Sequence, residues 1–255
     1  MTTQKDKAES FAQLHVSGDP VILFNIWDAG SAKAVAAAGA KAIATGSHSV
    51  AVANGYDDGE QVPFDFAVAN FERIVASVDL PATLDFEGGY AAEAAGLKLN
   101  IAKVIAAGAV GINFEDQIVG GDGLYSIEEQ SARILAIRET ADETDIPLFI
   151  NARCDLFLKN GPDTHANHVD AAIERAVAYA EAGASGFFAP GLKDPALIKQ
   201  ICELSPLPIN IMVMADTPSN SEMAALGVAR ISYGPGPYRQ MIEALRQAAL
   251  NARVA

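Results

Sequence analysis

Hydrophobic and polar positions follow a repeated pattern along the chain. Four segments run from the small residues of a helix end through a Gly to a short β-branched or aromatic stretch, which is typical of a helix leading into a strand. Four further apolar runs supply the remaining strands. The helix-to-strand segments are 34–47, 104–116, 179–190 and 223–234, and the further apolar runs are 21–27, 80–86, 146–152 and 207–213.

The stretches between these strands have helical length and are amphipathic or Ala-rich. They include 64–77, 91–107, 126–143 and 166–182. Eight strands alternating with helices over 255 residues predict an α/β protein, a (β/α)8 TIM barrel in one domain spanning 1–255. Residues 1–17 predict an extra helix ahead of the first strand. An open doubly wound sheet is the alternative, but the first strand runs into NIWDAGS (25–31) rather than a Gly-rich phosphate-binding fingerprint.

Acidic and cationic side chains lie where three of the predicted strands end. Side chains alternate between the two faces of a strand. Asp85 and Glu87 therefore share one face, and we expect Glu115 and Arg153 on the corresponding face of the next two strands. At about 4 Å and an effective dielectric near 20, each carboxylate pair repels by roughly 4 kcal/mol, so converging acids require protons or a bound cation. The three motifs are TLDFEGGY (83–90), VGINFEDQ (110–117) and FINARCD (149–155).

This acidic cluster predicts a divalent metal ion. Carboxylate oxygens suit a hard cation such as Mg²⁺, which keeps much of its hydration, with Mn²⁺ as the alternative. The predicted ligands, directly or through water, are Asp85, Glu87 and Glu115. The simpler interpretation of each acid is a loop cap or a solvated side chain. Two glycines follow Glu87 and allow the backbone to turn sharply.

Other polar residues at the strand ends are candidates for catalysis or substrate binding. Arg153 suits a bidentate grip on a substrate carboxylate or a salt bridge to a neighbouring acid. Asp28 is either a helix N-cap or a site residue. The run TGSHS (45–49) offers backbone N–H groups for an oxyanion hole, and its His48 is a base, a solvated residue or a structural donor. The remaining candidates are Gly46, Ser47, Trp27, Asp58 and Asn210.

Composition narrows the classes of partner. The formal net charge is −14 and the pI about 4.6, which argues against binding of nucleic acid or of an anionic membrane surface. Cys154 and Cys202 fit reduced, buried thiols better than a disulfide framework. The polar N-terminal stretch has no apolar core of signal-peptide length, and no apolar run is long enough to span a membrane. We therefore expect a soluble, cytoplasmic protein with a small-molecule substrate.

The strand-end motifs together resemble those of the phosphoenolpyruvate mutase/isocitrate lyase superfamily. The resemblance runs from about residue 20 to the GPGPYR turn (234–239), with four motifs in order. It implies that the three acids named above surround magnesium, mostly through water, and that Arg153 holds the substrate carboxylate. It also implies homo-oligomers, dimers or tetramers, in which a C-terminal helix, here 237–250, packs on a neighbouring subunit. By the same resemblance the α-oxo acid pocket is lined by Trp27, Asp28, Gly46 and Ser47, and Asp58 matches the family's Asp on the loop after strand two.

One loop departs from the family pattern. The lyases that the chain resembles carry a Lys-Lys/Arg-Cys-Gly-His loop after strand four, whose Cys is the general acid. The phosphonomutases carry a longer loop there with an Asn near the transferred group. This chain has IVGGDGLYS (118–126), without Cys, Lys, Arg or Asn. The metal and oxo-acid half of the site therefore matches the family better than the half that defines the reaction.

The chemistry that the resemblance implies passes through an enolate of pyruvate or of a related 2-oxo acid. The leading hypothesis is a Mg-dependent enzyme that cleaves a C–C bond or decarboxylates a small 2-oxo acid, or acts on its 2-hydroxy acid precursor. Phosphonomutase-type P–C chemistry is the alternative. A non-catalytic protein that binds a 2-oxo acid is an alternative of another class.

Overall fold

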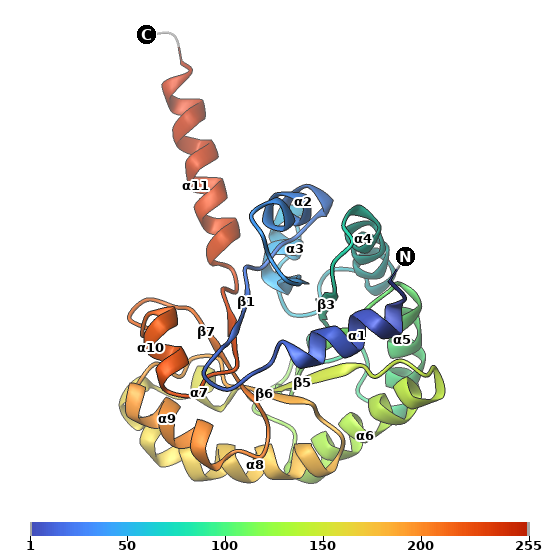
Figure 1. Cartoon of the computed structure of the whole chain (residues 1–255), viewed down its shortest axis with the longest axis vertical. Coiled ribbons are helices and arrows are strands. Elements are labelled where there is room, and N and C mark those ends of the chain that lie inside the picture. Colours follow the sequence, from blue (N-terminus) through green and yellow to red (C-terminus); the bar gives the residue numbers. More distant parts are fainter. Residues whose placement is uncertain (1, 254–255) are drawn as a thin grey trace.

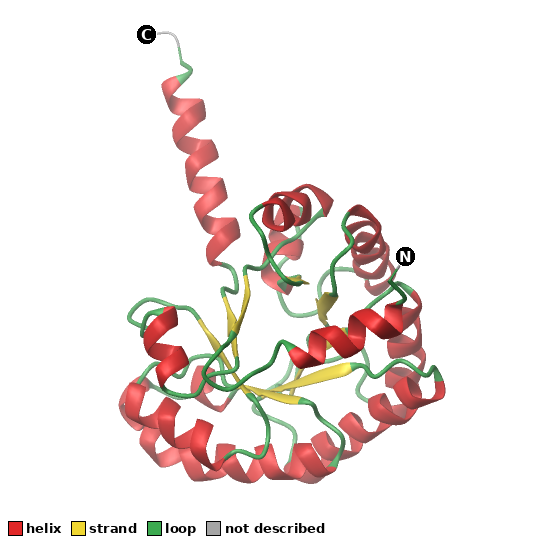
Figure 2. Cartoon of the chain, viewed as in Figure 1, coloured by secondary structure: helices red, strands yellow, loops and turns green. Residues whose placement is uncertain are grey.

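Eight parallel strands form a barrel at the centre of the protein, surrounded by helices (Figure 2). The computed structural model describes residues 2–253. All eight predicted strands are confirmed: seven lie within their predicted segments, and the strand predicted at 146–152 extends one residue further, to Arg153. They are β1 (Val21–Leu23), β2 (Ile43–Ala44), β3 (Ala82–Asp85), β4 (Gly111–Glu115), β5 (Phe149–Arg153), β6 (Gly186–Phe188), β7 (Ile209–Met212) and β8 (Arg230–Ser232).

The barrel closes between its first two strands. The hydrogen-bonded order runs β1-β8-β7-β6-β5-β4-β3-β2. Just beyond β1, the Ile26 N–H donates to the Ala44 carbonyl at 2.9 Å, and the Gly46 N–H donates to the Ile26 carbonyl at 3.2 Å. Since these bonds join the two ends of the sheet, the TIM barrel prediction is confirmed and the open doubly wound sheet is excluded.

Helices cover the outside of the barrel, and one long helix leaves it (Figure 1). The predicted helix at 64–77 coincides with α4, and the predicted N-terminal helix is α1. The helices are α1 (Gln4–Gln13), α2 (Ala29–Ala37), α3 (Ser47–Ala53), α4 (Phe64–Ser77), α5 (Ala94–Ala106), α6 (Ile127–Glu143), α7 (Leu156–Lys159), the 3-10 helix η1 (Pro162–His168), α8 (Val169–Glu181), α9 (Pro195–Leu204), α10 (Asn220–Ala225) and α11 (Gly236–Asn251).

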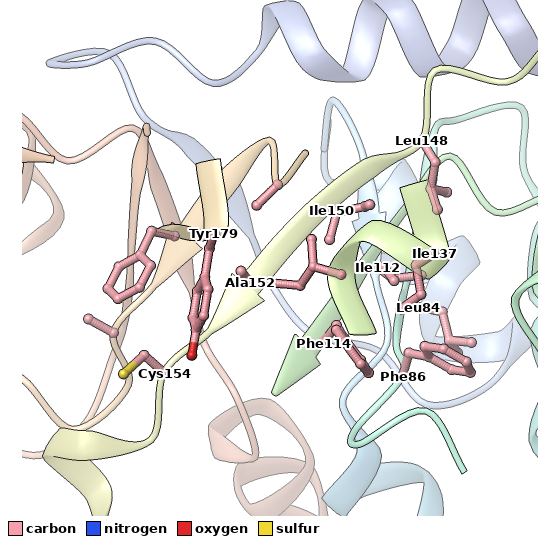
Figure 3. Close-up of a cluster of buried hydrophobic side chains, with 14 of the residues drawn as sticks. Leu84, Phe86, Ile112, Phe114, Ile137, Leu148, Ile150, Ala152, Cys154 and Tyr179 are labelled. Carbon is pink, nitrogen blue, oxygen red and sulfur yellow. The ribbon is translucent and has the colours of Figure 1, made fainter. Parts of the chain in front are cut away.

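The main hydrophobic core lies between the strands and the outer helices. Phe86 and Phe114 are fully buried there, as strand parity predicts, with ring centroids 6.2 Å apart. Figure 3 shows them beside Ile137 of α6. Cys154 belongs to the same core, and burial raises its thiol pKa well above the usual range. The predicted reduced, packed thiol is therefore confirmed.

Helix α1 closes the end of the barrel at which the strands begin. Its Phe11 is fully buried, and its ring centroid lies 5.6 Å from that of Phe149 on β5. These two rings belong to a second apolar cluster. Its other buried members are Ala8, Val21, Leu23, Ala42, Ala44 and Val110. Because this end is sealed, ligands have access from the opposite end, where the strands finish.

The ring of His15, just after α1, predicts acid sensitivity of the fold. It stacks on Phe149 with centroids 3.8 Å apart, and Nδ1 contacts the Phe11 carbonyl at 2.9 Å. Burial, aided by the positive charge of Arg230, lowers the His15 pKa to about 3. Below pH ~6.5 the unfolded chain gains a proton that the folded chain does not, so the free energy of unfolding should fall by about 1.4 kcal/mol per pH unit from this group, toward pH 3.

Urea unfolding at pH 7.5 and pH 5.0 measures this loss. The variant His15→Gln should show a smaller difference between the two pH values than the wild-type protein. An equal difference in both proteins would assign the acid sensitivity to other groups.

Helix α11 extends away from the barrel (Figure 1). The predicted C-terminal helix at 237–250 is thereby confirmed as a helix. It carries exposed apolar side chains, among them Ile242 and Leu245. Its exchange between subunits stays a prediction. Within residues 2–253, no helix combines the length and apolar character needed to cross a membrane.

Candidate functional site

A cavity of about 210 Å³ opens at the carboxyl ends of the barrel strands. Five of the residues expected at the site, from four different segments, line it together: Gly46, Ser47, Asp58, Asp85 and Arg153. The other lining residues are Asn25, His48, Asn113, Leu158, Phe188, Met212, Ser232, Gly234, Pro235 and Arg239. The cavity thus lies at the end of the barrel where TIM-barrel enzymes hold their catalytic groups.

Asp85 is the last residue of β3 and has one carboxylate oxygen left for a ligand. Its Oδ2 accepts the Ser47 N–H at 3.0 Å. Its Oδ1 is buried and lies within hydrogen-bonding distance of no donor among the described residues. A buried carboxylate oxygen without a donor is costly, so Oδ1 is the atom in this cavity best placed to bind a cation.

Glu87 does not line this cavity, and both its carboxylate oxygens accept hydrogen bonds. Its Oε2 accepts the Glu60 N–H at 2.7 Å, and its Oε1 accepts the Tyr90 hydroxyl at 2.9 Å. Burial, followed by the negative charges of Asp85 and Asp58, raises the Glu87 pKa to about 7. The acids predicted from the sequence therefore do repel one another, as the cation hypothesis requires.

The turn after Glu87 needs its glycines. Gly89 has φ of 87°, and a Cβ there would lie 2.3 Å from the Leu97 side chain. Arg133 of α6 secures the turn by donating from Nη2 to the carbonyls of Gly88 and Ala91, at 2.6 and 3.0 Å. The guanidinium of Arg133 also lies over the rings of Phe114 and Tyr125. Sequence reasoning missed Arg133 because it comes from a helix about 45 residues further along the chain.

Arg153 joins two buried carboxylates at the ends of β4 and β5. Its Nη1 lies 2.8 Å from Glu115 Oε2, while Nε and Nη2 donate to the two oxygens of Asp155 at 2.6 and 2.9 Å. Burial opposes the charge on Arg153, but the two carboxylates outweigh it and raise the Arg153 pKa. Burial raises the pKa of Glu115, and Arg153 opposes that rise. The salt-bridge interpretation of Arg153 is confirmed, and one N–H on each terminal nitrogen remains for substrate.

The three acids do not form a ready-made set of direct metal ligands. Among residues 2–253, no group of three His, Cys, Asp or Glu side chains converges as a metal site would require. Asp85 alone of the three has an oxygen without a donor or cation, because Glu87 is hydrogen-bonded and Glu115 is paired with Arg153. These residues fit a hydrated Mg²⁺ that Asp85 would contact and that Glu87 and Glu115 would hold through water.

The backbone of Gly46 and Ser47 has a different role from the one expected. The Gly46 N–H donates to Ile26 and closes the barrel, and the Ser47 N–H donates to Asp85. Neither N–H is therefore free to form an oxyanion hole, and that expectation is wrong for these two groups. The two residues still line the cavity.

Trp27 and Asp28 lie outside this cavity. Asp28 is the N-cap of α2, where its Oδ1 accepts the Ser31 N–H at 2.7 Å. Trp27 meets Tyr238 edge to face at 5.1 Å. Both face a separate hollow of about 640 Å³ between α2 and α11. The structure therefore supports the N-cap interpretation of Asp28, and a role of either residue at the site stays a prediction.

Asn210 lies beneath the cavity rather than on its wall. It is 1% exposed, and its Oδ1 accepts the Ser232 hydroxyl at 3.2 Å. Ser232 itself lines the cavity. Contact of Asn210 with substrate remains a prediction.

Sequence reasoning missed or undervalued two further side chains of the cavity, Arg239 and His48. Arg239 comes from the GPGPYR turn, which has no charged pattern that would distinguish it from a structural turn. His48 lies with its Nδ1 3.8 Å from Asp58 Oδ2. Its place in the first turn of α3, beside Gly46 and Ser47, was the available signal. The guanidinium groups of Arg239 and Arg153 bring positive charge to a cavity that the acids alone would make strongly negative.

Known proteins with similar sequences and structures match nearly the whole chain. The sequence model of the phosphoenolpyruvate phosphomutase family matches residues 11–253. A solved protein of Burkholderia cenocepacia, assigned provisionally as a phosphonomutase, is 46% identical, with a TM-score of 0.96 over 98% of this chain and 100% of that one. An uncharacterized protein of Mycobacterium tuberculosis is 32% identical over 94% of this chain and 87% of its own length.

A relative of assigned activity matches a smaller part. The 2-methylisocitrate lyase of Escherichia coli is 30% identical over 69% of this chain and 60% of its own length. The family model spans nearly the whole barrel, including the strands that carry Asp85, Glu115 and Arg153. The chain therefore belongs to the phosphoenolpyruvate phosphomutase family, within the phosphoenolpyruvate mutase/isocitrate lyase superfamily.

Proposed function

We propose that the protein is a magnesium-dependent enzyme that acts on a small 2-oxo acid, or on its 2-hydroxy acid precursor, by C–C bond cleavage or decarboxylation. The observation that carries the proposal is the placement of the free Asp85 Oδ1 and the Arg153 guanidinium on the wall of one cavity. A 2-oxo acid has two features that match them: a carboxylate for a guanidinium, and an oxo oxygen for a cation.

Named relatives support this class of chemistry. The Escherichia coli relative is a 2-methylisocitrate lyase. An oxaloacetate decarboxylase of Ectopseudomonas mendocina is 31% identical over 68% of this chain and 58% of its own length. A phosphonopyruvate hydrolase with the same fold has been solved with oxalate and Mg²⁺. All three names concern small 2-oxo acids, their precursors or oxalate.

Four residues at the ends of the strands have defined tasks in this proposal. Arg153 orients the substrate carboxylate through the N–H groups that Glu115 and Asp155 leave free. Asp85, with Glu87 and Glu115 through water, would hold magnesium. When bound, magnesium supplies positive charge that stabilises the negative charge developing on the oxo oxygen.

In this proposal, the general acid or base comes from outside loop 118–126. Val119 and Tyr125 of that loop line a different pocket, beside Arg133. Asp58 and its neighbour His48 are titratable groups that do line the cavity. Their separation of 3.8 Å is within the range that a substrate-induced movement can shorten to a hydrogen bond. We therefore assign proton transfer to Asp58, with His48 beside it.

Turnover of a panel of 2-oxo and 2-hydroxy acids, with and without Mg²⁺, tests the proposed function. One acid should be consumed only in the presence of the metal. In Asp58→Asn, binding of that acid should persist while turnover falls by about 100-fold or more, as for loss of a general acid or base. Absence of metal-dependent turnover in a cooperatively folded sample would contradict the proposal.

Phosphonomutase chemistry is the second candidate because the 46% identical Burkholderia protein carries that provisional assignment. Adding phosphonopyruvate to the panel distinguishes the two reactions. Its conversion, without turnover of other acids, would replace C–C cleavage by P–C chemistry. Tight binding of a 2-oxo acid without turnover of any compound would instead indicate a binding protein.

A further inference from the structure

Arg230 places a guanidinium inside the barrel, beneath the floor of the cavity. It is the first residue of β8 and is 1% exposed. Its Nη2 donates to Asn113 Oδ1 at 2.9 Å, and its Nε lies 3.4 Å from the Ser232 hydroxyl. Both of these neighbours line the cavity, whereas Arg230 does not. The guanidinium is therefore one side chain away from the space that a ligand would occupy.

This guanidinium has no carboxylate partner. Within residues 2–253, no carboxylate oxygen lies within 4.0 Å of Arg230, and its buried Nη1 has no acceptor within hydrogen-bonding distance. Arg153, in contrast, is paired with two acids. Burial lowers the Arg230 pKa to about 9, partly offset by the negative charge of Asp85, so the group still carries its charge at neutral pH. A buried, unpaired charge destabilises a fold.

Arg230 also fixes the orientation of the Asn113 amide. A guanidinium can only donate, so the Asn113 atom that it contacts must be the oxygen. Asn151 Nδ2 donates to the same oxygen at 2.9 Å. With Oδ1 held from two sides, the Asn113 Nδ2 is the amide atom left for the cavity. Asn113 lies beside Asp85 in the register of β3 and β4, so its N–H groups are next to the predicted cation site.

The fold itself has little need of the Arg230 charge. Without Arg230, Asn113 Oδ1 would still accept from Asn151, and the Ser232 hydroxyl would still donate to Asn210. No acceptor would be left without a donor. An apolar side chain of similar volume would also remove the desolvation penalty of the buried charge.

We propose that Arg230 is a positioning residue of the 2-oxo acid site: it holds the Asn113 amide N–H toward the cavity and places a positive charge beneath the bound anion. This inference rests on the proposed function. A binding role explains why the Arg230 charge lies inside the barrel although it lowers the stability of the fold, because proteins can retain a destabilising group that binding requires. It also identifies Asn113 as the donor through which Arg230 acts.

Calorimetric titration with oxalate in saturating Mg²⁺, together with thermal melts, tests the proposal. Oxalate is a stable, planar mimic of the pyruvate enolate. Arg230→Met should raise the melting midpoint and weaken oxalate binding by about 10- to 100-fold. Arg230→Lys, which keeps the charge but loses the fork that holds Asn113, should bind with intermediate affinity. Asn113→Leu should weaken binding as Arg230→Met does, and the double variant should be little worse than either single one.

Arg138→Met is the matched control, because Arg138 donates to the carbonyls of Gly183 and Leu148 far from the cavity. It should lower the midpoint and leave oxalate affinity unchanged. The positioning role is overturned if Arg230→Met binds oxalate as the wild-type protein does, or if both Arg230 variants fail to fold, since the charge would then be structural. If wild-type protein binds neither oxalate nor any 2-oxo acid, the proposed function itself fails and the role of Arg230 fails with it.

Discussion

Replacing Arg153 with Met is expected to lower the free energy of unfolding by about 3–5 kcal/mol, the usual effect of removing one partner from a buried ion pair. The side chains of Glu115 and Asp155 are 4% and 1% exposed, and both contact Arg153. Without the guanidinium, two carboxylates would remain buried and close together. The loss should become smaller at lower pH, because protonation would remove the uncompensated charges.

Chemical unfolding in urea measures this loss. Arg246→Met is the matched control, because Arg246 pairs with Glu243 on the exposed face of α11, where ion pairs contribute little. Its unfolding midpoint should stay close to the wild-type value. If Arg153→Met were as stable as the wild-type protein, the network at the ends of β4 and β5 would not be the buried charge balance described above.

Replacing Asp85 with Asn should reduce metal-dependent turnover by at least about 100-fold. The change removes the negative charge from Oδ1, the oxygen that no described donor reaches. The amide oxygen of Asn can still accept the Ser47 N–H, so the fold should persist. Loss of this charge should also lower the Glu87 pKa, since Asp85 is one cause of its rise to about 7.

Titration of activity against Mg²⁺ checks this prediction, and Asp79→Asn is its control. Asp79 is exposed and pairs with Lys7, far from the cavity, so the same chemical change there should leave turnover and its metal dependence unchanged. If Asp85→Asn showed the same turnover and the same dependence on Mg²⁺ as the wild-type protein, the metal would bind elsewhere.

The barrel could be predicted from the sequence because each βα unit repeats the same local pattern. The Gly at the end of a helix, followed by a short β-branched or aromatic run, predicted four of the strands, and apolar runs predicted the other four. Strand parity correctly separated Phe86 and Phe114, which face the helices, from Asp85, which faces the cavity. Parity is reliable only inside a strand, and β3 ends at Asp85.

Contacts between distant segments limited the prediction of the site. Glu87 follows the end of β3 with φ of 50°, where strand parity no longer applies. One of its oxygens accepts the N–H of Glu60, from a loop that the strand pattern does not reach, and the other accepts the Tyr90 hydroxyl of its own turn. Trp27 and Asp28 follow β1, but the chain turns into α2 there and takes both away from the cavity.

Arg230 could not be identified from the sequence either. It begins a short strand, and neither its neighbours in the chain nor its spacing show that Asn113, 117 residues earlier, receives its hydrogen bond. Side-chain pairing across the barrel requires the three-dimensional structure.

A thermal melt with Mg²⁺, with a panel of 2-oxo acids, and with both together tests the central claim most directly. A ligand at about 100 times its Kd adds roughly 2.7 kcal/mol, which in a chain of this size should raise the melting midpoint by roughly 5–10 °C. The account predicts that one acid gives this rise only together with Mg²⁺, and that Asp85→Asn loses it. A cooperative melt that neither magnesium nor any 2-oxo acid shifts would contradict the assignment of this cavity as a metal-dependent 2-oxo acid site.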